Sequence, residues 1–200
     1  LDDQDWRYNL SQVQLLGIPH FSAYALTVEE GTLLHHQIRQ QKARPVDAGQ
    51  SAAQFEIMTE QAARMGYEHY EISNLALPGH HAIHNTAYWQ GIPYLGIGPS
   101  AHSFNGRSRK WNIANNALYT QNLLREGRLL YEEEQLTPVQ SLNEYIMTSL
   151  RTMWGCDLEK IAREWGNDYA VKIESASLPF KEKNWLQQQD RKLLLTGAGK

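Results

Sequence analysis

Cysteine is almost absent from this sequence of 200 residues, which contains one, Cys156. A disulfide needs two cysteines, and cysteine-based zinc and iron–sulfur sites use several. Neither a disulfide framework nor such a metal site can therefore be completed within this chain. Any iron–sulfur chemistry would need cysteines from outside it.

The sequence also lacks a basic excess and a long apolar run. Its 19 Lys and Arg residues face 22 Asp and Glu residues, for a net charge of −3. That balance excludes the basic footprint of a protein that binds DNA, RNA or an anionic membrane surface. No apolar run approaches the roughly 20 residues that span a bilayer, and no secretory leader opens the chain. We expect a soluble, cytoplasmic protein.

What is present indicates a globular fold and part of a longer protein. Hydrophobic residues make up 42% of the sequence, enough to bury a core in a chain of this length, which excludes a wholly disordered chain. The chain opens on Leu1 rather than Met and closes on residues 195–200, within what reads as a continuing element. We expect a fragment.

Helical and strand patterns alternate over the first 73 residues. Each is bounded by a Gly or Pro turn, which is typical of parallel βα units in an α/β fold. With two such units, the sheet or barrel is incomplete here, and the strands at 20–26 and 67–72 should leave at least one edge unpaired, covered by a loop or matched with another chain. The predicted elements are helices over 3–16, 32–41 and 47–65 and strands over 20–28 and 67–73.

Beyond residue 104 the pattern changes to helices. We expect helices over 115–126, 137–153, 157–165 and 168–177, followed by short strands over 184–187 and 192–196. Three helices and a hairpin are typical of a winged-helix arrangement. The boundary between the two parts is soft and lies near 112–136.

The run HNTAYW at 84–89 allows two interpretations. His84 and Tyr88 are four residues apart, on the same side of a helical turn, and Asn85 is a good N-cap residue, so the run fits a capped helix with aromatic residues in the core. Alternatively, His84 offers a ring nitrogen to a metal such as a haem iron, with Tyr88 and Trp89 lining an apolar slot. Adding His80 and His81 gives a spacing that matches no zinc signature well.

The run YLGIGPSAHSF at 94–104 reads as a short strand followed by Gly96 and Gly98. Glycines at alternate positions allow a ligand to approach the backbone closely, although a GxG without a third glycine is weak evidence for a nucleotide.

Two further groups of polar residues allow a functional and an ordinary reading. Those at the end of the second strand either bind a ligand or cap the strand. The cations after residue 104 either meet carboxylates, such as porphyrin propionates, or belong to a solvated loop. The first group is Glu71, Ser73 and Asn74, and the second is Arg107, Arg109 and Lys110.

Several runs occur in an order that resembles the radical S-adenosylmethionine family of oxygen-independent coproporphyrinogen III oxidases. They are SAYALTVEEGT at 22–32, GYEHYEISNLALPG at 66–79, HNTAYW and YLGIGPSAHSF, and the resemblance continues through 144–166 and the closing LLLTGAGK. The HNTAYW run matches the HNxxYW motif of the haem-chaperone branch.

That resemblance implies the C-terminal part of a partial (β/α)6 barrel over 1–112 and a mostly helical, winged-helix-like domain, truncated, over 113–200. In the family, a [4Fe–4S] cluster on a C-x-x-x-C-x-x-C loop cleaves S-adenosylmethionine to a 5′-deoxyadenosyl radical. This chain lacks that loop, and Cys156 is no substitute for it. We therefore expect no catalytic residue in this chain and no radical activity from it alone.

The resemblance also assigns candidate binding residues. Tyr24, Ala25 and His102 match positions that contact S-adenosylmethionine. The haem-associated motif carries over to four residues of the HNTAYW run, with His84 a possible iron ligand: His84, Asn85, Tyr88 and Trp89.

Three functions remain open. The first is a haem chaperone that binds haem and delivers it to an acceptor protein. The second is oxidative decarboxylation of coproporphyrinogen III to protoporphyrinogen IX, and the third is a non-catalytic winged-helix interaction module. The HNTAYW run favours the first.

Overall fold

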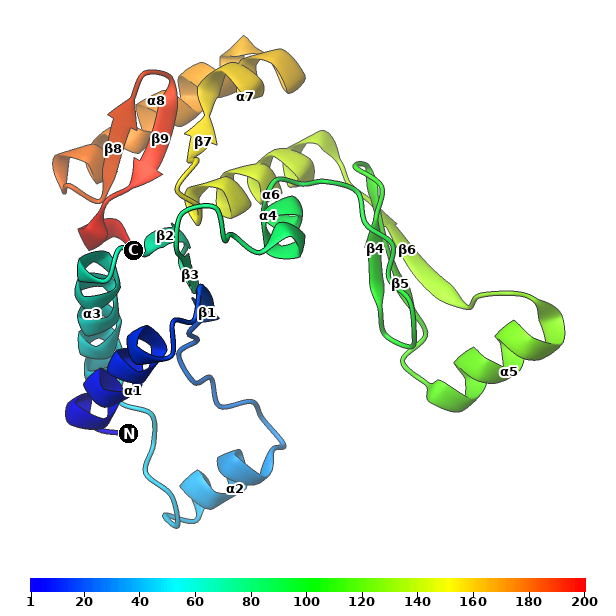
Figure 1. Ribbon diagram of the computed structural model, residues 1–200. Coiled ribbons are helices and arrows are strands. Elements are labelled where there is room, and N and C mark those ends of the chain that lie inside the picture. The colour runs from blue at the N-terminus through cyan, green and yellow to red at the C-terminus, as the bar shows by residue number, and fades with distance from the viewer. The chain divides into compact units, whose positions relative to one another are not determined.

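The computed structural model describes all 200 residues, and its chain forms two compact units, Leu1–Ala82 and Ile83–Lys200 (Figure 1). Each unit is described separately below. The predicted domain boundary between residues 112 and 113 stays a prediction. None of the helices has the length and apolar character needed to cross a membrane.

Three helices belong to the first unit: α1 Asp3–Leu15, α2 Leu33–Arg39 and α3 Ala48–Arg64. Helices α1 and α3 start at Asp2 and Asp47, whose side chains accept hydrogen bonds from backbone N–H groups of the first turn. These helices pack together, and their buried side chains meet Tyr67 and Leu75 in one core. The helix predictions for this unit are confirmed.

A three-stranded sheet completes the first unit. Strands β1 His20–Ser22, β2 Glu68–Glu71 and β3 Asn74–Ala76 lie in the order β1-β3-β2, and β3 is antiparallel to both neighbours. Strands β1 and β2 therefore run in the same direction, as expected for parallel βα units, but they do not pair with each other, because β3 lies between them. No closed barrel forms, and the outer edges of β1 and β2 have no strand partner in the sheet.

The second unit begins with α4 Ile83–Trp89 and continues into an antiparallel sheet with the order β4-β5-β6. Its strands are β4 His102–Phe104, β5 Ser108–Asn112 and β6 Tyr131–Gln135, and α5 Asn116–Glu126 connects β5 to β6. The predicted helix over 115–126 is confirmed as α5, but the helical pattern beyond residue 104 did not predict this sheet. We call residues 102–135 the arm.

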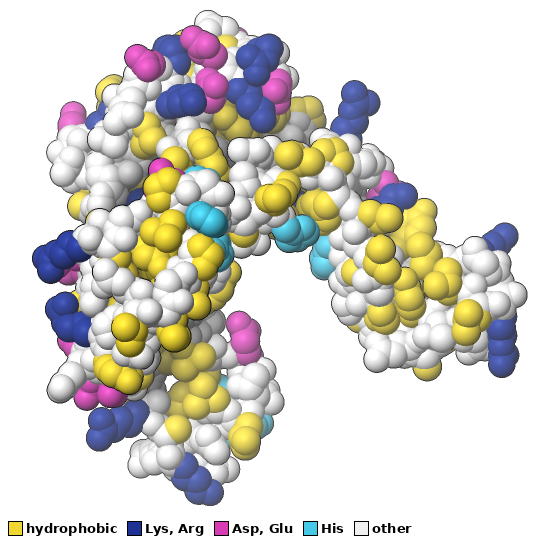
Figure 2. Space-filling view, viewed as in Figure 1, with side chains coloured by type: hydrophobic (Ala, Val, Ile, Leu, Met, Phe, Trp, Pro, Cys, Tyr) yellow, Lys and Arg dark blue, Asp and Glu magenta, His cyan; other side chains and the backbone are white.

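The arm exposes many apolar side chains. Helix α5 buries none of its residues, and hydrophobic side chains gather over the arm on the face shown in Figure 2. The large apolar residues of the arm that are at least 39% exposed all lie in 118–131: Leu118, Leu123, Leu124, Leu129, Leu130 and Tyr131.

The rest of the second unit has the winged-helix element order. Helix α6 Pro138–Leu150 leads to β7 Cys156–Asp157, α7 Leu158–Glu164, α8 Asn167–Glu182, β8 Leu186–Gln189 and β9 Lys192–Leu195, and a short 3-10 helix Gly197–Gly199 closes the chain. The sheet order is β7-β9-β8, so the hairpin adds to β7 through β9. Leu142, Cys156, Leu158, Ile161 and Leu193 form the buried core. The predicted three helices and hairpin are confirmed.

Candidate functional site

An open hollow of about 570 Å³ lies in the second unit and includes three of the predicted binding residues, His84, Tyr88 and His102. We call it the His84 hollow. Its volume falls within the roughly 300–1,000 Å³ of small-molecule sites. It is lined by His84, Tyr88, Tyr94, Leu95, Gly96, His102 and Arg109.

Helix α4 contributes one wall of the hollow. His84 and Tyr88 both line it, as their spacing of four residues predicts, and both are exposed. Trp89 does not line it: the guanidinium of Arg151, at the end of α6, lies 5.0 Å from the Trp89 ring centroid. Asn85 lies within α4 rather than before it, so its predicted N-cap role is wrong.

Strand β4 and the chain before it form the opposite wall. Tyr94 and Phe104 exchange two backbone hydrogen bonds of 2.9 Å, which bring residues 94–96 beside β4. A Cβ on Gly96 would overlap the carbonyl oxygen of His102 and lie 2.7 Å from its carbonyl carbon. Gly96 therefore allows two segments of the backbone to pack closely. The strand expected at residue 94 is present only as an isolated bridge between Tyr94 and Phe104.

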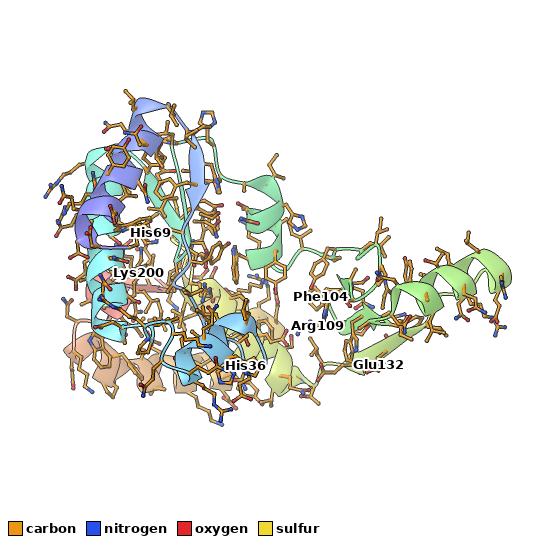
Figure 3. The ribbon with its side chains drawn as sticks, turned by 90° about the horizontal axis from the view of Figure 1, so that it is seen from below. His36, His69, Phe104, Arg109, Glu132 and Lys200 are labelled. Atoms are coloured by element: carbon orange, nitrogen blue, oxygen red, sulfur yellow. The ribbon has the colours of Figure 1, made fainter.

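Arg109 is the cation of the hollow. It lies on β5 opposite Phe104 of β4, with its guanidinium carbon 5.9 Å from the Phe104 ring centroid, and Figure 3 shows the two side by side at the base of the arm. Its Nη2 donates to Glu144 Oε2 of α6 at 2.8 Å, and both side chains are about one-third exposed, 32% and 29%. Lys110 instead pairs with Glu133 at 3.5 Å, and Arg107 is exposed.

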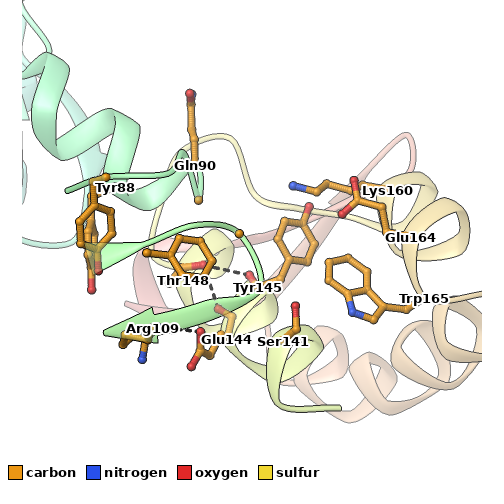
Figure 4. Close-up of a pocket in the computed structure, with 14 residues that line it drawn as sticks. Tyr88, Gln90, Arg109, Ser141, Glu144, Tyr145, Thr148, Lys160, Glu164 and Trp165 are labelled. Atoms are coloured by element: carbon orange, nitrogen blue, oxygen red, sulfur yellow. Dashed lines mark hydrogen bonds and ion pairs between the residues drawn. The ribbon is translucent and has the colours of Figure 1, made fainter. Parts of the chain in front are cut away.

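A smaller cavity of about 160 Å³ shares Tyr88, Tyr94 and Arg109 with the hollow (Figure 4). We call it the Tyr145 cavity. Tyr145 stacks on Trp165 with ring centroids 5.4 Å apart, and its hydroxyl accepts a hydrogen bond from the Asp157 N–H at 3.0 Å. Burial raises the pKa of Tyr145 to about 12. Burial also raises the pKa of Tyr94, the nearby Tyr88 adds to the rise, and Arg109 opposes it.

The first unit holds the other predicted site residues. Tyr24 and Ala25 follow β1 and line an apolar pocket of about 480 Å³ with Trp6, Leu10 and Phe21. Tyr24 is 73% exposed. The S-adenosylmethionine contact at Tyr24, Ala25 and His102 stays a prediction.

The polar residues after β2 serve the local fold. The buried carboxylate of Glu71 accepts hydrogen bonds from the Ser73 N–H at 3.0 Å and from the Asn74 side-chain amide. Asn74 in turn accepts from the Ser22 hydroxyl at 2.6 Å. This network closes the turn between β2 and β3 and ties it to β1, in accord with the strand-capping interpretation.

The residues present do not fit an iron–sulfur cluster. Cys156 is fully buried in the winged-helix core, and burial raises the pKa of its thiol, which disfavours the thiolate that binds iron. No group of three His, Cys, Asp or Glu side chains is arranged to hold a metal ion. A haem iron, by contrast, accepts a single histidine, and His84 offers its ring to a hollow with aromatic walls.

Comparison with known proteins places the chain. The haem chaperone HemW of Mycobacterium tuberculosis is 29% identical over 198 residues, covering 99% of this chain and 49% of the relative, and HemW of Bacillus subtilis is 25% identical over 193 residues, covering 96% and 51%. A third relative, the mouse mitochondrial radical S-adenosyl methionine domain-containing protein 1, is 35% identical over 99 residues, covering 50% and 22%. No family model matches.

These comparisons support the radical S-adenosylmethionine, HemW-like family that the sequence suggested. The chain spans about half the length of the HemW relatives. Among solved structures, coproporphyrinogen III oxidase (HemN) from Escherichia coli, a radical SAM enzyme, matches with a TM-score of 0.73 and 17% identity over 100% of this chain and 49% of that one. At that identity the likeness shows the fold, that of the C-terminal part of HemN.

Sequence reasoning on this HemW-like chain missed part of the hollow. Tyr94 and Leu95 line it, and Glu144 holds Arg109, but none of the three was predicted as a site residue. The alternation of β5 was an available signal, since it turns Arg109 and Lys110 to opposite faces of the sheet.

Proposed function

We propose that this chain supplies the haem-binding site of a HemW-type haem chaperone and that His84 ligates the haem iron. Tyr88 and Tyr94 then flank the macrocycle. One observation carries the proposal: His84 and Tyr88 of the HNTAYW run face one porphyrin-sized hollow with a cation on its wall. The names of the relatives, haem chaperones along nearly the whole chain, support the same activity.

Ligation by His84 requires an imidazole ring that reaches the iron from one side. An exposed histidine on the first turn of a short helix meets that requirement, because its ring is not buried in the core. The aromatic rings of Tyr88 and Tyr94, with centroids 5.7 Å apart and planes at 42° to each other, give aromatic surface for a porphyrin to contact.

Decarboxylation of coproporphyrinogen III is the alternative that the HemN fold suggests. It would require a radical-generating cluster, and this chain has no cysteine set to hold one. Radical SAM membership implies that a [4Fe–4S] cluster and S-adenosylmethionine act in the whole protein, with the cluster held by cysteines from outside this chain. Delivery of haem to an acceptor is likewise a property to test on the whole protein.

Haem titration of the 200-residue chain, followed by the Soret band, tests the proposal. We expect a shifted Soret band in the wild-type chain, at least about tenfold weaker binding in His84→Ala, and no change in His36→Ala, an exposed histidine of α2 outside the hollow. Equal spectra and affinities in wild type and His84→Ala would refute ligation by His84. Loss of the band in His102→Ala but not in His84→Ala would assign the ligand to the other wall.

A further inference from the structure

Arg109 stands alone as a charged group on the wall of the His84 hollow. The remaining lining residues are two histidines, two tyrosines, a leucine and a glycine, with no carboxylate among them. A ligand carboxylate entering the hollow therefore meets one cation and no carboxylate among the lining residues. A guanidinium suits this task, since its planar fork matches a carboxylate and it remains charged at any physiological pH.

The partner of Arg109 in the ligand-free chain belongs to another element. Glu144 comes from α6, and its Oε2 accepts from Arg109 Nη2 at 2.8 Å (Figure 4). Glu144 lines the Tyr145 cavity and not the His84 hollow, so it reaches Arg109 from the opposite side of the shared wall. On the arm itself, Glu134 is the cross-strand neighbour of Arg109, and its Oε1 accepts from Gln140 at 3.4 Å.

We propose that Arg109 recognises a carboxylate of the porphyrin bound in the His84 hollow and that Glu144 is the internal competitor which holds this guanidinium until the ligand arrives. The inference rests on the proposed function, because it assigns the propionate contact of the same site. It explains why a partly exposed arginine and glutamate from different elements form a 2.8 Å pair at this wall. Exchange of Glu144 for a propionate keeps the number of charge-assisted bonds to Arg109 and releases one link between the arm and α6.

The neighbouring ion pair between Lys110 of β5 and Glu133 of β6 supplies a matched control. Lys110 lies one residue along β5, pairs with Glu133 at 3.5 Å on the other face of the sheet, and does not line the hollow. Lys110→Gln and Glu133→Gln therefore remove one positive and one negative charge, as the two test variants do, without touching the wall. Neither should alter porphyrin affinity.

Metal-free protoporphyrin IX and its dimethyl ester are the probes, with binding to the 200-residue chain followed by porphyrin fluorescence. We expect the free acid to bind about tenfold more tightly than the diester, and Arg109→Gln to remove that difference by weakening the acid alone. Glu144→Gln should tighten binding of the acid by about fivefold and leave the diester unchanged, since it removes the competitor.

The outcomes separate this inference from the proposed function. No binding of either probe would overturn the inference, while the haem titration of wild type and His84→Ala decides the proposed function separately. Binding of acid and diester with equal affinity, or an unchanged preference for the acid in Arg109→Gln, would overturn the role of Arg109 alone, because the metal-free probes do not depend on ligation by His84. Weaker binding of the acid in Glu144→Gln would overturn the competitor role, and circular dichroism of each variant separates these effects from misfolding.

Discussion

Replacing Gly96 by alanine tests the wall of the His84 hollow formed by residues 94–96 and β4, where two backbone segments pack closely. Gly96 lies beside β4, its N–H donates to Ser103 Oγ at 3.0 Å, and its carbonyl accepts from the Asn112 side chain at 3.4 Å. An added Cβ would lie 2.7 Å from the His102 carbonyl carbon and 2.8 Å from that of Ala101, whereas ordinary contacts lie at 3.4–4 Å. Because these obstacles are backbone atoms, the wall has to move.

The size of the shift sets the expected cost. Residues 94–96 must separate from β4 by more than half an ångström, and over-packing of this kind costs about 1–3 kcal/mol. We expect this cost to weaken the two 2.9 Å backbone hydrogen bonds between Tyr94 and Phe104, which join these segments. If these bonds open locally, hydrogen exchange of the two amides should accelerate by about 5- to 150-fold. Displacement of His102 should also weaken haem binding.

Hydrogen exchange with residue resolution is the assay, and Gly197→Ala is its control. A Cβ on Gly197 meets no atom within 4 Å and its φ is not in the left-handed region, so the same substitution there should leave Tyr94 and Phe104 unchanged. Wild-type exchange at both amides in Gly96→Ala, with wild-type haem affinity, would refute the close packing of this wall.

Two further predictions concern pH. Tyr145→Phe removes the bond from the Asp157 N–H and should cost about 1 kcal/mol at pH 7 in chemical denaturation. Because burial raises the pKa of Tyr145 from 10.0 to about 12, its stabilisation is present below pH 10 and lost as pH rises through about 12, so the variant should lose less stability over that range. The pKa of His20 is lowered from 6.5, mainly by burial and secondly by the charge of His81, so the first unit should lose stability as pH falls below 6.5. A His20→Gln variant that loses as much stability as the wild type over this pH range would contradict this.

The sequence predicted the helices well because their end signals are local. Asp47 caps α3 through the Gln50 N–H, and Thr137 with Gln140 forms the capping box that opens α6. Each signal lies within four residues of the group that it satisfies. Nothing about the distant fold was needed to find them.

The sheet of the arm escaped prediction because its strands are polar on both faces. Strand β6 reads YEEEQ and every residue in it is exposed. Its stability comes instead from pairs across the sheet, such as Lys110 with Glu133 and the Trp111 indole, which donates to Glu132 at 3.1 Å. Such partners are more than 20 residues apart, so no local period reveals them.

The two glycines of the GIG run illustrate the same limit within the site. Their spacing indicated a backbone open to a ligand, and it does mark a close approach at Gly96, but the approaching group is the backbone of His102. Gly98 differs, because its φ of 109° is a conformation that suits glycine. Spacing therefore identified the residues that need glycine, and only the fold identified what approaches one of them.

The shared wall also decides where a porphyrin fits. The Tyr145 cavity, about 160 Å³, is below the roughly 300 Å³ at which small-molecule sites begin, whereas the His84 hollow is about 570 Å³. In the proposed function a porphyrin would therefore occupy the hollow and reach the cavity only through the residues common to both: Tyr88, Tyr94 and Arg109. Of these, Arg109 alone is ion-paired to α6. A structural change caused by a ligand in the hollow would therefore reach the winged-helix part of the unit through this guanidinium or through the two tyrosine rings.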